Sequence, residues 1–465
     1  MRSSARGRPR VGIVGLGYMG LGTGLAFAAR GLTVFGYDMN PEIRAAVARG
    51  STPYHEAGLP ELLRSQVRSG RFRVVHALDD LVRLSEGIFL CVPTPPRADG
   101  HIDLRPLTVA AEEVGRAIGR TRGYRLVVVK STVVPGTTET VVLPTVLRSS
   151  RRTGRTVGVA SNPEFLAEGT MVEDALHPDR VVIGTSDRRS EAWLTRAYRP
   201  FRAPIVTLSP SGAELVKYSA NAFLALKVSF ANEVGRLADR LGVHVDRVME
   251  AVGRDPRIGP KFLRAGPGFG GSCFEKDVSA FVATAGDLGV RMRTGSAALR
   301  ANAEQLEYVL EFMRAVIGPL SGKKVALLGL AFKAGTDDVR ESRALLIAER
   351  LVAMGALVRG HDPAAAGSFR RAWKSRGRRG RGRLVICDTL DEALSGADVA
   401  VLQADWPEYV RWTRARSRRM HLPLLIDLRR AVDPRDARRA GLRVIGLGAG
   451  DIANVKRGSV SRSTG

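Results

Sequence analysis

The chain has 465 residues, of which 44% are hydrophobic, and a formal net charge of +26. This length is typical of two or three domains, and no apolar run is long enough to predict a membrane-spanning helix. The basic N-terminus leads into an apolar stretch that glycines interrupt, which makes a poor export signal. Three cysteines cannot form a disulfide framework, so we expect a cytoplasmic protein.

A dinucleotide-binding pattern lies near the start of the sequence. The apolar run at residues 11–14 directly precedes GLGYMG and a segment rich in helix-forming residues. In this pattern Gly15 forms the tight turn, Gly17 lets the backbone approach a pyrophosphate, and Gly20 allows close helix packing. The next predicted strand ends at Asp38, where a carboxylate would bind a ribose 2′-hydroxyl and repel a 2′-phosphate. The pattern therefore predicts NAD rather than NADP.

Alternating strands and helices predict two α/β domains. Their order is typical of two Rossmann-like doubly wound parallel sheets, joined by a long central helix and a helical segment. We expect strands near 11–14, 32–37, 72–75, 87–92, 125–129, 157–160 and 181–184, and helices from 212 and over 246–252, 278–288, 296–316 and 342–354. The expected parts are a basic tail (1–10), a nucleotide domain (11–208), a helical domain (209–320), a second α/β domain (321–450) and a flexible tail (451–465).

Polar residues follow several predicted strands of the first domain. One strand ends at Val92 and turns through Pro93 and Thr94, and another is followed by Ser131 and Thr132. A third leads to Asn162, Glu164 and Glu168. Because parallel sheets bind ligands at the carboxyl ends of their strands, we expect these side chains to face the nicotinamide end of the cofactor.

Cys273 lies between a glycine run and a Glu-Lys-Asp cluster in GPGFGGSCFEKD, residues 266–277. Glycines permit close approach to a ligand, and a nearby cation favours the thiolate, so this cysteine is a candidate nucleophile. The alternative is a small hydrophobic core residue. Lys217 and Asn221 are four residues apart on the predicted long helix and therefore share one face, where a lysine could stabilise an oxyanion; a salt bridge is the alternative.

A strongly basic segment interrupts the second α/β domain. Residues 370–383 contain eight basic and no acidic side chains. Trp373 is their only aromatic residue, so specific reading of nucleic-acid bases is disfavoured. We expect a solvated basic loop over 367–383, with weak affinity for polyanions or membrane surfaces at most.

The motifs together resemble the UDP-glucose/GDP-mannose dehydrogenase family. GLGYMG, CVPTP, KSTV, NPEFLAEGT, RIGPKFL, GFGGSCFEKD, GLAFKAGTDDVRES and IDLRR occur in the family order from residue 11 to about 446. The resemblance implies an NAD-binding first domain, a helical segment that forms the core of a homodimer or higher homo-oligomer, and a C-terminal domain that binds the nucleotide of a sugar nucleotide. NAD is the one cofactor that it implies.

The resemblance also implies roles for individual residues in a double oxidation without release of an aldehyde. The implied catalytic residues are Cys273 as nucleophile, Lys217 and Asn221 at oxyanions, Asp277 and Thr132 for water, and Glu164 as acid or base. The implied cofactor-binding residues are Gly15, Gly17, Tyr18, Met19, Gly20, Asp38, Val92, Pro93, Thr94, Thr132, Glu168 and Arg340. The implied substrate-binding residues are Glu164, Phe165, Leu166, Glu168, Lys217, Asn221, Gly268, Phe269, Gly270, Lys333 and Arg429, with Arg257 entering from a partner subunit.

The same motifs indicate which sugar nucleotide is the substrate. GGSC followed by Phe274, together with the RIG at 257–259, is similar to the branch of the family that uses UDP-glucose. One alternative is another sugar nucleotide, such as a UDP-N-acetylhexosamine or GDP-mannose. An alternative of a different class is a non-catalytic protein that binds polyanions or membrane surfaces through its basic residues.

Overall fold

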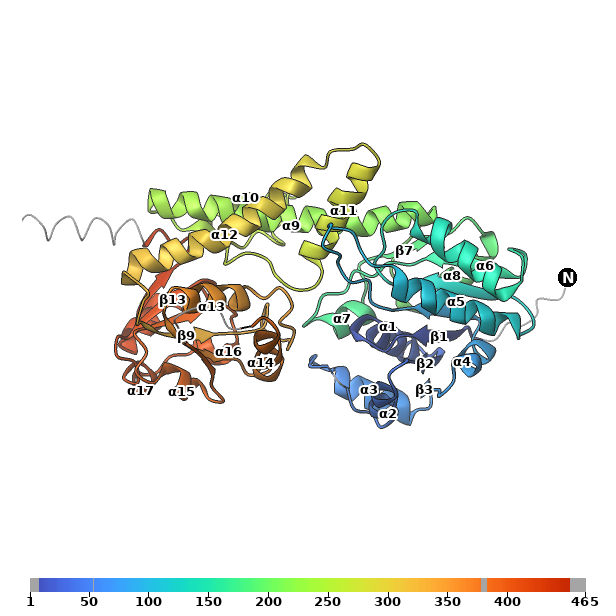
Figure 1. The fold of residues 1–465 in the computed structure, drawn as a ribbon, viewed down its shortest axis with the longest axis horizontal. Helices are drawn as coiled ribbons and strands as arrows, with labels where there is room; N and C mark the ends of the chain where they lie inside the picture. Colours follow the sequence, from blue (N-terminus) through green and yellow to red (C-terminus); the bar gives the residue numbers. More distant parts are fainter. Residues whose placement is uncertain (1–7, 53, 378–382, 452–465) are drawn as a thin grey trace, which may run out of the picture. The chain divides into compact units, whose positions relative to one another are not determined.

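The computed structural model describes residues 8–52, 54–377 and 383–451. These residues form two compact units, the first ending at Ala220 and the second beginning at Asn221. Each unit contains one sheet, drawn in blue to green for the first and in orange to red for the second (Figure 1). The boundary falls within the helix α9 (Pro210–Leu241).

The first unit contains an eight-stranded sheet in the order β3-β2-β1-β4-β5-β6-β7-β8. The first six strands of that order are parallel, whereas β7 meets β6 antiparallel through the single pair Ser161 and Gly184. The strands are β1 (Arg10–Val14), β2 (Thr33–Tyr37), β3 (Phe72–Val74), β4 (Gly87–Leu90), β5 (Arg125–Val129), β6 (Val157–Ser161), β7 (Val181–Gly184) and β8 (Ile205–Leu208). The chain order reverses between β1 and β4, and this reversal creates the ligand-binding crevice of an open parallel sheet.

Helices cover the first sheet because its central strands are apolar on both faces. Val11 and Ile13 pack with α1, while α4 lies so close to the opposite face that a side chain at Gly12 would collide with Leu81. The helices are α1 (Tyr18–Ala29), α2 (Pro41–Ala48), α3 (Leu59–Arg68), α4 (Leu78–Leu84), α5 (Arg105–Gly119), α6 (Leu143–Ser150), α7 (Met171–Leu176) and α8 (Arg188–Tyr198), with the short turns η1 (Thr138–Val142) and η2 (Arg199–Phe201).

The second unit contains helices and a six-stranded parallel sheet in the order β11-β10-β9-β12-β13-β14. Its strands are β9 (Lys324–Leu328), β10 (Leu357–His361), β11 (Arg383–Ile386), β12 (Val399–Leu402), β13 (Leu424–Asp427) and β14 (Arg443–Gly446). Its helices are α10 (Val245–Gly253), α11 (Phe274–Asp287), α12 (Arg293–Ile317), α13 (Arg343–Ala353), α14 (Ala366–Ser375), α15 (Leu390–Leu394), α16 (Pro407–Val410), α17 (Arg414–Ser417) and α18 (Pro434–Arg439).

Alternating residues of β9 divide the core of this second unit into two layers. Val325 and Leu327 belong to the cluster formed with α12 and α13, whereas Ala326 and Leu328 belong to the cluster formed with α15 and α18. Both sets are buried, as expected when helices cover both faces of a parallel sheet.

The predicted fold class, two α/β units with parallel sheets and a long helix between them in the chain, is confirmed. The strand β8 was not predicted, because its short sequence IVTL lies directly after a proline and carries no clear alternation. Helix α11 begins at Phe274 rather than at 278. A turn at 447–450 follows the end of β14.

The prediction of a loop over residues 367–383 is wrong for its first part. Helix α14 covers 366–375, since Phe369 is buried in the core and stacks against Trp373 at 6.5 Å between ring centroids. The remaining basic residues at 378–382 lie outside the described residues, as do most of the predicted tails, at 1–7 and 452–465. Among the helices that are described, none is both long and apolar enough to cross a membrane.

A buried carboxylate in α9 connects three segments of the second unit. Asp239 is fully buried and accepts hydrogen bonds from the Tyr308 hydroxyl at 2.8 Å and from the backbone N–H groups of Gly448 and Gly450 at 2.9 and 3.2 Å. We expect Asp239→Ala to lower the free energy of unfolding by about 2–4 kcal/mol, because it leaves buried donors without an acceptor.

Thermal unfolding monitored by circular dichroism checks this expectation. The matched control is Glu311→Ala, which removes an exposed carboxylate from α12 and should change stability by less than about 0.5 kcal/mol. Equal transition temperatures for the two variants would contradict the structural role assigned to Asp239.

Candidate active site

The loop between β1 and α1 has the backbone geometry that a dinucleotide pyrophosphate requires. Gly15 has φ +94°, and a Cβ atom there would lie 2.5 Å from the Cys91 carbonyl oxygen. A Cβ atom at Gly20 would lie 1.8 Å from the Gly15 carbonyl oxygen, so only glycine permits this packing. A Cβ atom at Gly17 would have no closer neighbour than the Tyr54 hydroxyl oxygen, at 3.8 Å. Gly17 is also the N-cap of α1, so the first amides of the helix lie beside an open approach for an anion.

Asp38 lies at the end of β2, beside this loop. One carboxylate oxygen accepts the Leu16 backbone N–H at 2.8 Å, and the other accepts that of Asn40 at 2.9 Å. Each carboxylate oxygen has a second lone pair, so Asp38 retains acceptor capacity for ribose hydroxyls. The glycine loop and this carboxylate together fit NAD.

The loops that follow β4 and β5 are joined by two hydrogen bonds. Thr94 donates its hydroxyl to the carbonyl oxygen of Thr132 at 2.9 Å, and Ser131 donates to that of Val92 at 2.6 Å. The structure thus brings together the two polar strand ends that the sequence placed far apart. They lie at the carboxyl edge of the sheet, beside the point where the strand order reverses between the paired strands β1 and β4.

A buried ion pair lies at the end of the next strand. The Lys217 ammonium on α9 lies 2.8 Å from one carboxylate oxygen of Glu164, and both side chains are only 5–6% exposed. The second oxygen of Glu164 accepts the Leu166 N–H at 2.6 Å. The Phe165 ring lies beside Lys217, with 5.6 Å between the ammonium and the ring centroid, and Glu168 is buried in the same loop. A carboxylate and an ammonium in this water-poor setting can exchange protons with a substrate hydroxyl and stabilise an alkoxide.

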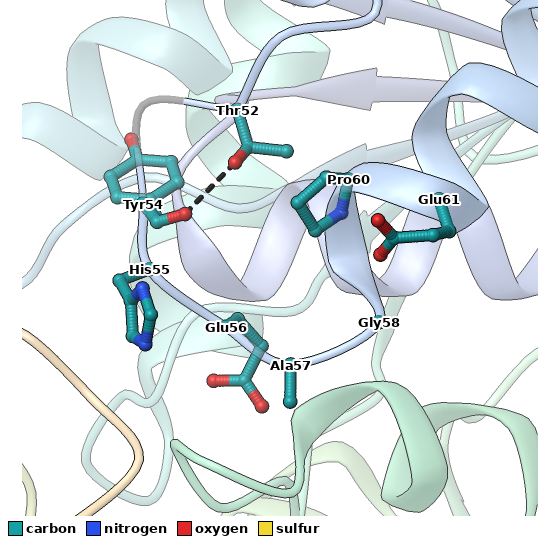
Figure 2. Close-up of a pocket in the computed structure, with 8 residues that line it drawn as sticks. All are labelled: Thr52, Tyr54, His55, Glu56, Ala57, Gly58, Pro60 and Glu61. Atoms are coloured by element: carbon teal, nitrogen blue, oxygen red, sulfur yellow. Dashed lines mark hydrogen bonds between the residues drawn. The ribbon is translucent and has the colours of Figure 1, made fainter.

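The segment between α2 and α3 lies beside the glycine-rich loop, and no motif in the sequence predicted this. Thr52, Tyr54, His55, Glu56 and neighbouring residues line a cavity of about 510 Å³, shown in Figure 2. The Tyr54 ring packs on Tyr18 of the glycine-rich loop with centroids 4.5 Å apart, and the Tyr18 hydroxyl donates to the His55 carbonyl oxygen. This cavity therefore adjoins the cofactor loop.

Glu56 connects the same segment to the loop that carries Glu168. Its carboxylate is buried and accepts the backbone N–H groups of Gly169 at 2.7 Å and Met171 at 2.8 Å, at the start of α7. No local pattern could identify this acceptor, because its donors lie more than a hundred positions later in the chain.

In the second unit, Cys273 occupies the N-cap position of α11 with an exposed side chain. The Ser272 hydroxyl lies 3.6 Å from its sulfur. A thiol at a helix N-terminus is favoured as thiolate by the aligned peptide dipoles, and exposure allows a substrate to reach it. The alternative of a buried core cysteine does not apply to Cys273. It applies to Cys387, which is buried, whereas Cys91 is half-buried.

The glycine run before Cys273 is explained largely by packing within the protein. A Cβ atom at Gly270 would lie 2.2 Å from the Glu341 carbonyl oxygen, and one at Gly271 would lie 2.9 Å from the Phe332 ring. Gly268 has φ +106° and is close to the Arg343 side chain. These contacts attach the cysteine loop to the turn that precedes α13, which the sequence pattern alone did not reveal.

Asp277 lies one turn after Cys273 on α11 and is 2% exposed. The Asn221 side-chain amide donates to one oxygen of its carboxylate at 2.6 Å, and the Lys276 ammonium lies 2.5 Å from the other. Because positions i and i+4 share a helix face, this carboxylate and the thiol of Cys273 lie on the same side of α11. The group can orient or activate a water molecule for attack on a carbon bound to the sulfur.

The arginines and the lysine predicted to bind cofactor or substrate differ in their contacts and exposure. Arg340 forms a bidentate ion pair with Asp338, and Arg257 forms one with Asp255 while remaining 87% exposed. Arg429 donates to the Gln403 carbonyl oxygen at 2.6 Å, and burial lowers the pKa of its guanidinium to about 10. Lys333 lies 5.5 Å from the centroid of the Phe332 ring.

The structure therefore assembles two groups of predicted residues. In the first unit it gathers the cofactor glycines and the loops after β4 and β5, and it pairs Glu164 with Lys217. In the second unit it gathers Asn221, Lys276 and Asp277 at the α11 end that carries Cys273. Lys217 and Asn221 both lie on α9, one helical turn apart.

Comparisons with known proteins agree with this arrangement. Residues 9–202 match the family model described as the NAD binding domain of the UDP-glucose/GDP-mannose dehydrogenase family, 211–304 match its central domain, and 326–434 match its UDP binding domain. The UDP-glucose 6-dehydrogenase AglM of Haloferax volcanii is 40% identical over 403 residues, which cover 85% of this chain and 91% of that protein.

Solved structures show the same similarity. A UDP-glucose dehydrogenase from Pyrobaculum islandicum has a TM-score of 0.86 and 39% identity, covering 96% of this chain and 99% of that one. A UDP-D-ManNAc dehydrogenase from Pyrococcus horikoshii has a TM-score of 0.79 and 28% identity, covering 95% and 100%. The family resemblance seen in the sequence motifs is confirmed: the chain belongs to the UDP-glucose/GDP-mannose dehydrogenase family and is an NAD-dependent oxidoreductase.

Proposed function

We propose that the protein oxidises UDP-glucose twice at C6 and produces UDP-glucuronate. The observation that carries this proposal is the exposed Cys273 thiol, one helical turn before the buried carboxylate of Asp277. The choice of sugar is supported by relatives named UDP-glucose 6-dehydrogenase and by the GGSC motif. A non-catalytic polyanion-binding protein is not favoured, since the chain belongs to a dehydrogenase family.

We further propose a division of labour along the chain. Residues 11–208 bind NAD, 209–320 form the core of a homodimer or higher homo-oligomer, and 321–450 bind the UDP moiety through Lys333 and Arg429. The exposed Arg257 is available to contact the substrate bound by a partner subunit. The reactive thiol suits the reducing cytoplasm, where it would not be lost to disulfide formation.

In the first oxidation, Glu164 accepts the proton of the C6 hydroxyl while the ammonium of Lys217 stabilises the developing alkoxide. When bound, NAD accepts one hydride in each of the two oxidations. The residues predicted around the nicotinamide are Val92, Pro93, Thr94, Thr132, Glu168 and Arg340. Tyr18 and Met19 accompany the glycines at the pyrophosphate.

In the second stage, the Cys273 thiolate adds to the aldehyde carbon, and the carbonyl oxygen gains a proton to form a thiohemiacetal. Lys217 and Asn221 stabilise the negative oxygen during addition and during loss of the second hydride, which leaves a thioester. The covalent bond to sulfur prevents the aldehyde from leaving between the two oxidations.

Hydrolysis completes the reaction. Asp277 orients a water molecule and takes one of its protons as the water oxygen attacks the thioester carbon, with Thr132 holding the water. The carbon–sulfur bond then breaks, the thiolate of Cys273 is restored, and the carboxylate product departs. In total, one UDP-glucose, one water and two NAD+ give one UDP-glucuronate as its carboxylate, two NADH and three protons.

Reaction stoichiometry tests the proposal directly. Purified protein is supplied with NAD and, separately, UDP-glucose, UDP-N-acetylglucosamine, UDP-N-acetylmannosamine or GDP-mannose, and NADH is measured per sugar consumed. We expect two NADH per UDP-glucose and no turnover of the others. Oxidation of another donor alone would overturn the choice of sugar, and one NADH per sugar would overturn the double oxidation.

The nucleophile assignment predicts the effect of Cys273→Ser. A serine hydroxyl is a far weaker nucleophile at neutral pH, so steady-state turnover should fall by at least about a thousandfold, while NAD affinity stays within about twofold. Calorimetry measures the affinity, and NADH absorbance measures the rate. Cys387→Ser, which changes a cysteine remote in sequence from the GGSC motif, is the matched control and should retain most activity. Near-normal turnover by the Cys273 variant would exclude covalent catalysis.

Cofactor selection predicts the effect of Asp38→Ala. Loss of a charged acceptor for ribose hydroxyls should raise the KM for NAD by about 10- to 100-fold. Loss of the charge that repels a 2′-phosphate should also reduce the preference of the enzyme for NAD over NADP. Initial rates with both cofactors check this. Asp80→Ala, which removes an exposed carboxylate paired with Arg83, should leave both KM values unchanged. If the ratio of the KM for NAD to the KM for NADP is unchanged in the Asp38 variant, the assignment is wrong.

A further inference from the structure

A second lysine of the first unit is buried near the acid–base pair and has no role in the reaction described above. Lys130 directly follows β5 and is 7% exposed. Its ammonium donates to the Asn162 side-chain oxygen at 3.0 Å, to the Tyr198 hydroxyl at 3.4 Å and to the Pro163 carbonyl oxygen at 3.5 Å. All three acceptors are neutral groups. A buried ammonium with neutral acceptors is costly unless another charge compensates it.

The compensating charge is the carboxylate of Glu164. Burial lowers the pKa of Lys130 to about 8, the charge of Glu164 opposes this shift, and that of Lys217 adds to it. Cys91 also interacts with Lys130, but burial raises the pKa of its thiol to about 12, so the thiol stays neutral. Burial likewise raises the pKa of Tyr198. Among the groups that act on the pKa of Lys130, Glu164 is therefore the one whose charge favours the ammonium form.

The contacts of Lys130 also determine where Glu164 lies. Asn162 and Pro163 are the two residues directly before Glu164, and Lys130 binds both. The Asn162 oxygen also accepts the Tyr198 hydroxyl at 2.5 Å, and its amide donates to the Val182 carbonyl oxygen at 2.7 Å. The peptide that begins the Glu164 loop is thus attached to β5, β7 and α8.

We propose that Lys130 is a positioning residue for the oxidation, which fixes the start of the Glu164 loop through its ammonium contacts to Asn162 and Pro163. Lys130 acts through Glu164 and touches neither substrate nor cofactor. This inference rests on the proposed function, in which Glu164 accepts the proton of the C6 hydroxyl. It adds a residue of the KSTV motif that acts on the position of Glu164 and not on the water assigned to Thr132.

The test compares variants that keep or remove the charge. Lys130→Met and Lys130→Gln remove it, and Lys130→Arg keeps it. The matched control is Lys374→Met, which removes an exposed lysine from α14. For each protein, kcat and KM for UDP-glucose are measured from about pH 5 to 9, together with NAD affinity and thermal stability. The wild-type stoichiometry is measured first, so that failure of the proposed function is recognised before any variant is interpreted.

Loss of the ammonium releases the Asn162 side chain and the Pro163 carbonyl oxygen, so Glu164 is held less closely in the geometry that proton transfer requires. The kcat of the Met and Gln variants should therefore fall by about tenfold or more, with smaller changes in KM and in NAD affinity. Lys130→Arg, which keeps a charged donor, should retain most of the wild-type kcat, and the control should match the wild type throughout.

A purely structural lysine would behave differently. If the neutral variants fold and keep the wild-type kcat while the wild type produces two NADH per sugar, the positioning role is wrong. If both neutral variants fail to fold, Lys130 serves stability alone and the proposal is overturned. An equal loss of kcat in Lys130→Arg would also overturn it, since the loss would then not depend on a charged donor at this position.

Discussion

The chemistry proposed for the first unit depends on a lysine and a glutamate that form an ion pair in the protein interior. Lys217 and Glu164 lie 2.8 Å apart and are each about one-twentieth exposed. Such a pair is expensive to desolvate, and either partner alone would be left as an uncompensated buried charge. It is therefore a weak source of stability but a strong constraint on geometry, because the loop after β6 and helix α9 must meet for the charges to be tolerated.

Hydrogen bonds with neighbouring side chains hold the loop that carries Glu164 in place. Glu56 accepts two N–H groups at the start of α7, while Lys130 binds the residues that precede Glu164. The loop with both carboxylates, Glu164 and Glu168, is thereby held from each side by a buried charged side chain. The role of general base that we propose for Glu164 would gain from such support, because proton transfer demands hydrogen-bond geometry within a fraction of an ångström.

The proposed nucleophile lies in the opposite kind of environment. Cys273 is exposed at the start of α11, where the helix dipole favours a thiolate, and its neighbours Asn221 and Asp277 are buried. The glycines before it give the loop room to pack against Glu341 and Phe332 rather than only room for a ligand. The basic segment at 370–383 lies partly in α14, where Phe369 and Trp373 supply the packing.

Local patterns in the sequence determined the elements and the chemistry of single residues: β1, Gly15 and Asp38 follow from a contiguous motif, and Cys273 from its glycine-rich neighbourhood. Strand β8 and the first turns of the basic segment escaped prediction because tertiary packing, rather than local propensity, decides short elements. The Glu56 cap, the Lys130 network and the pairing of Asn221 with Asp277 join positions from 32 to 115 residues apart. Only the tertiary structure decided these contacts, because burial and hydrogen-bond geometry depend on how distant elements pack and not on their order in the chain.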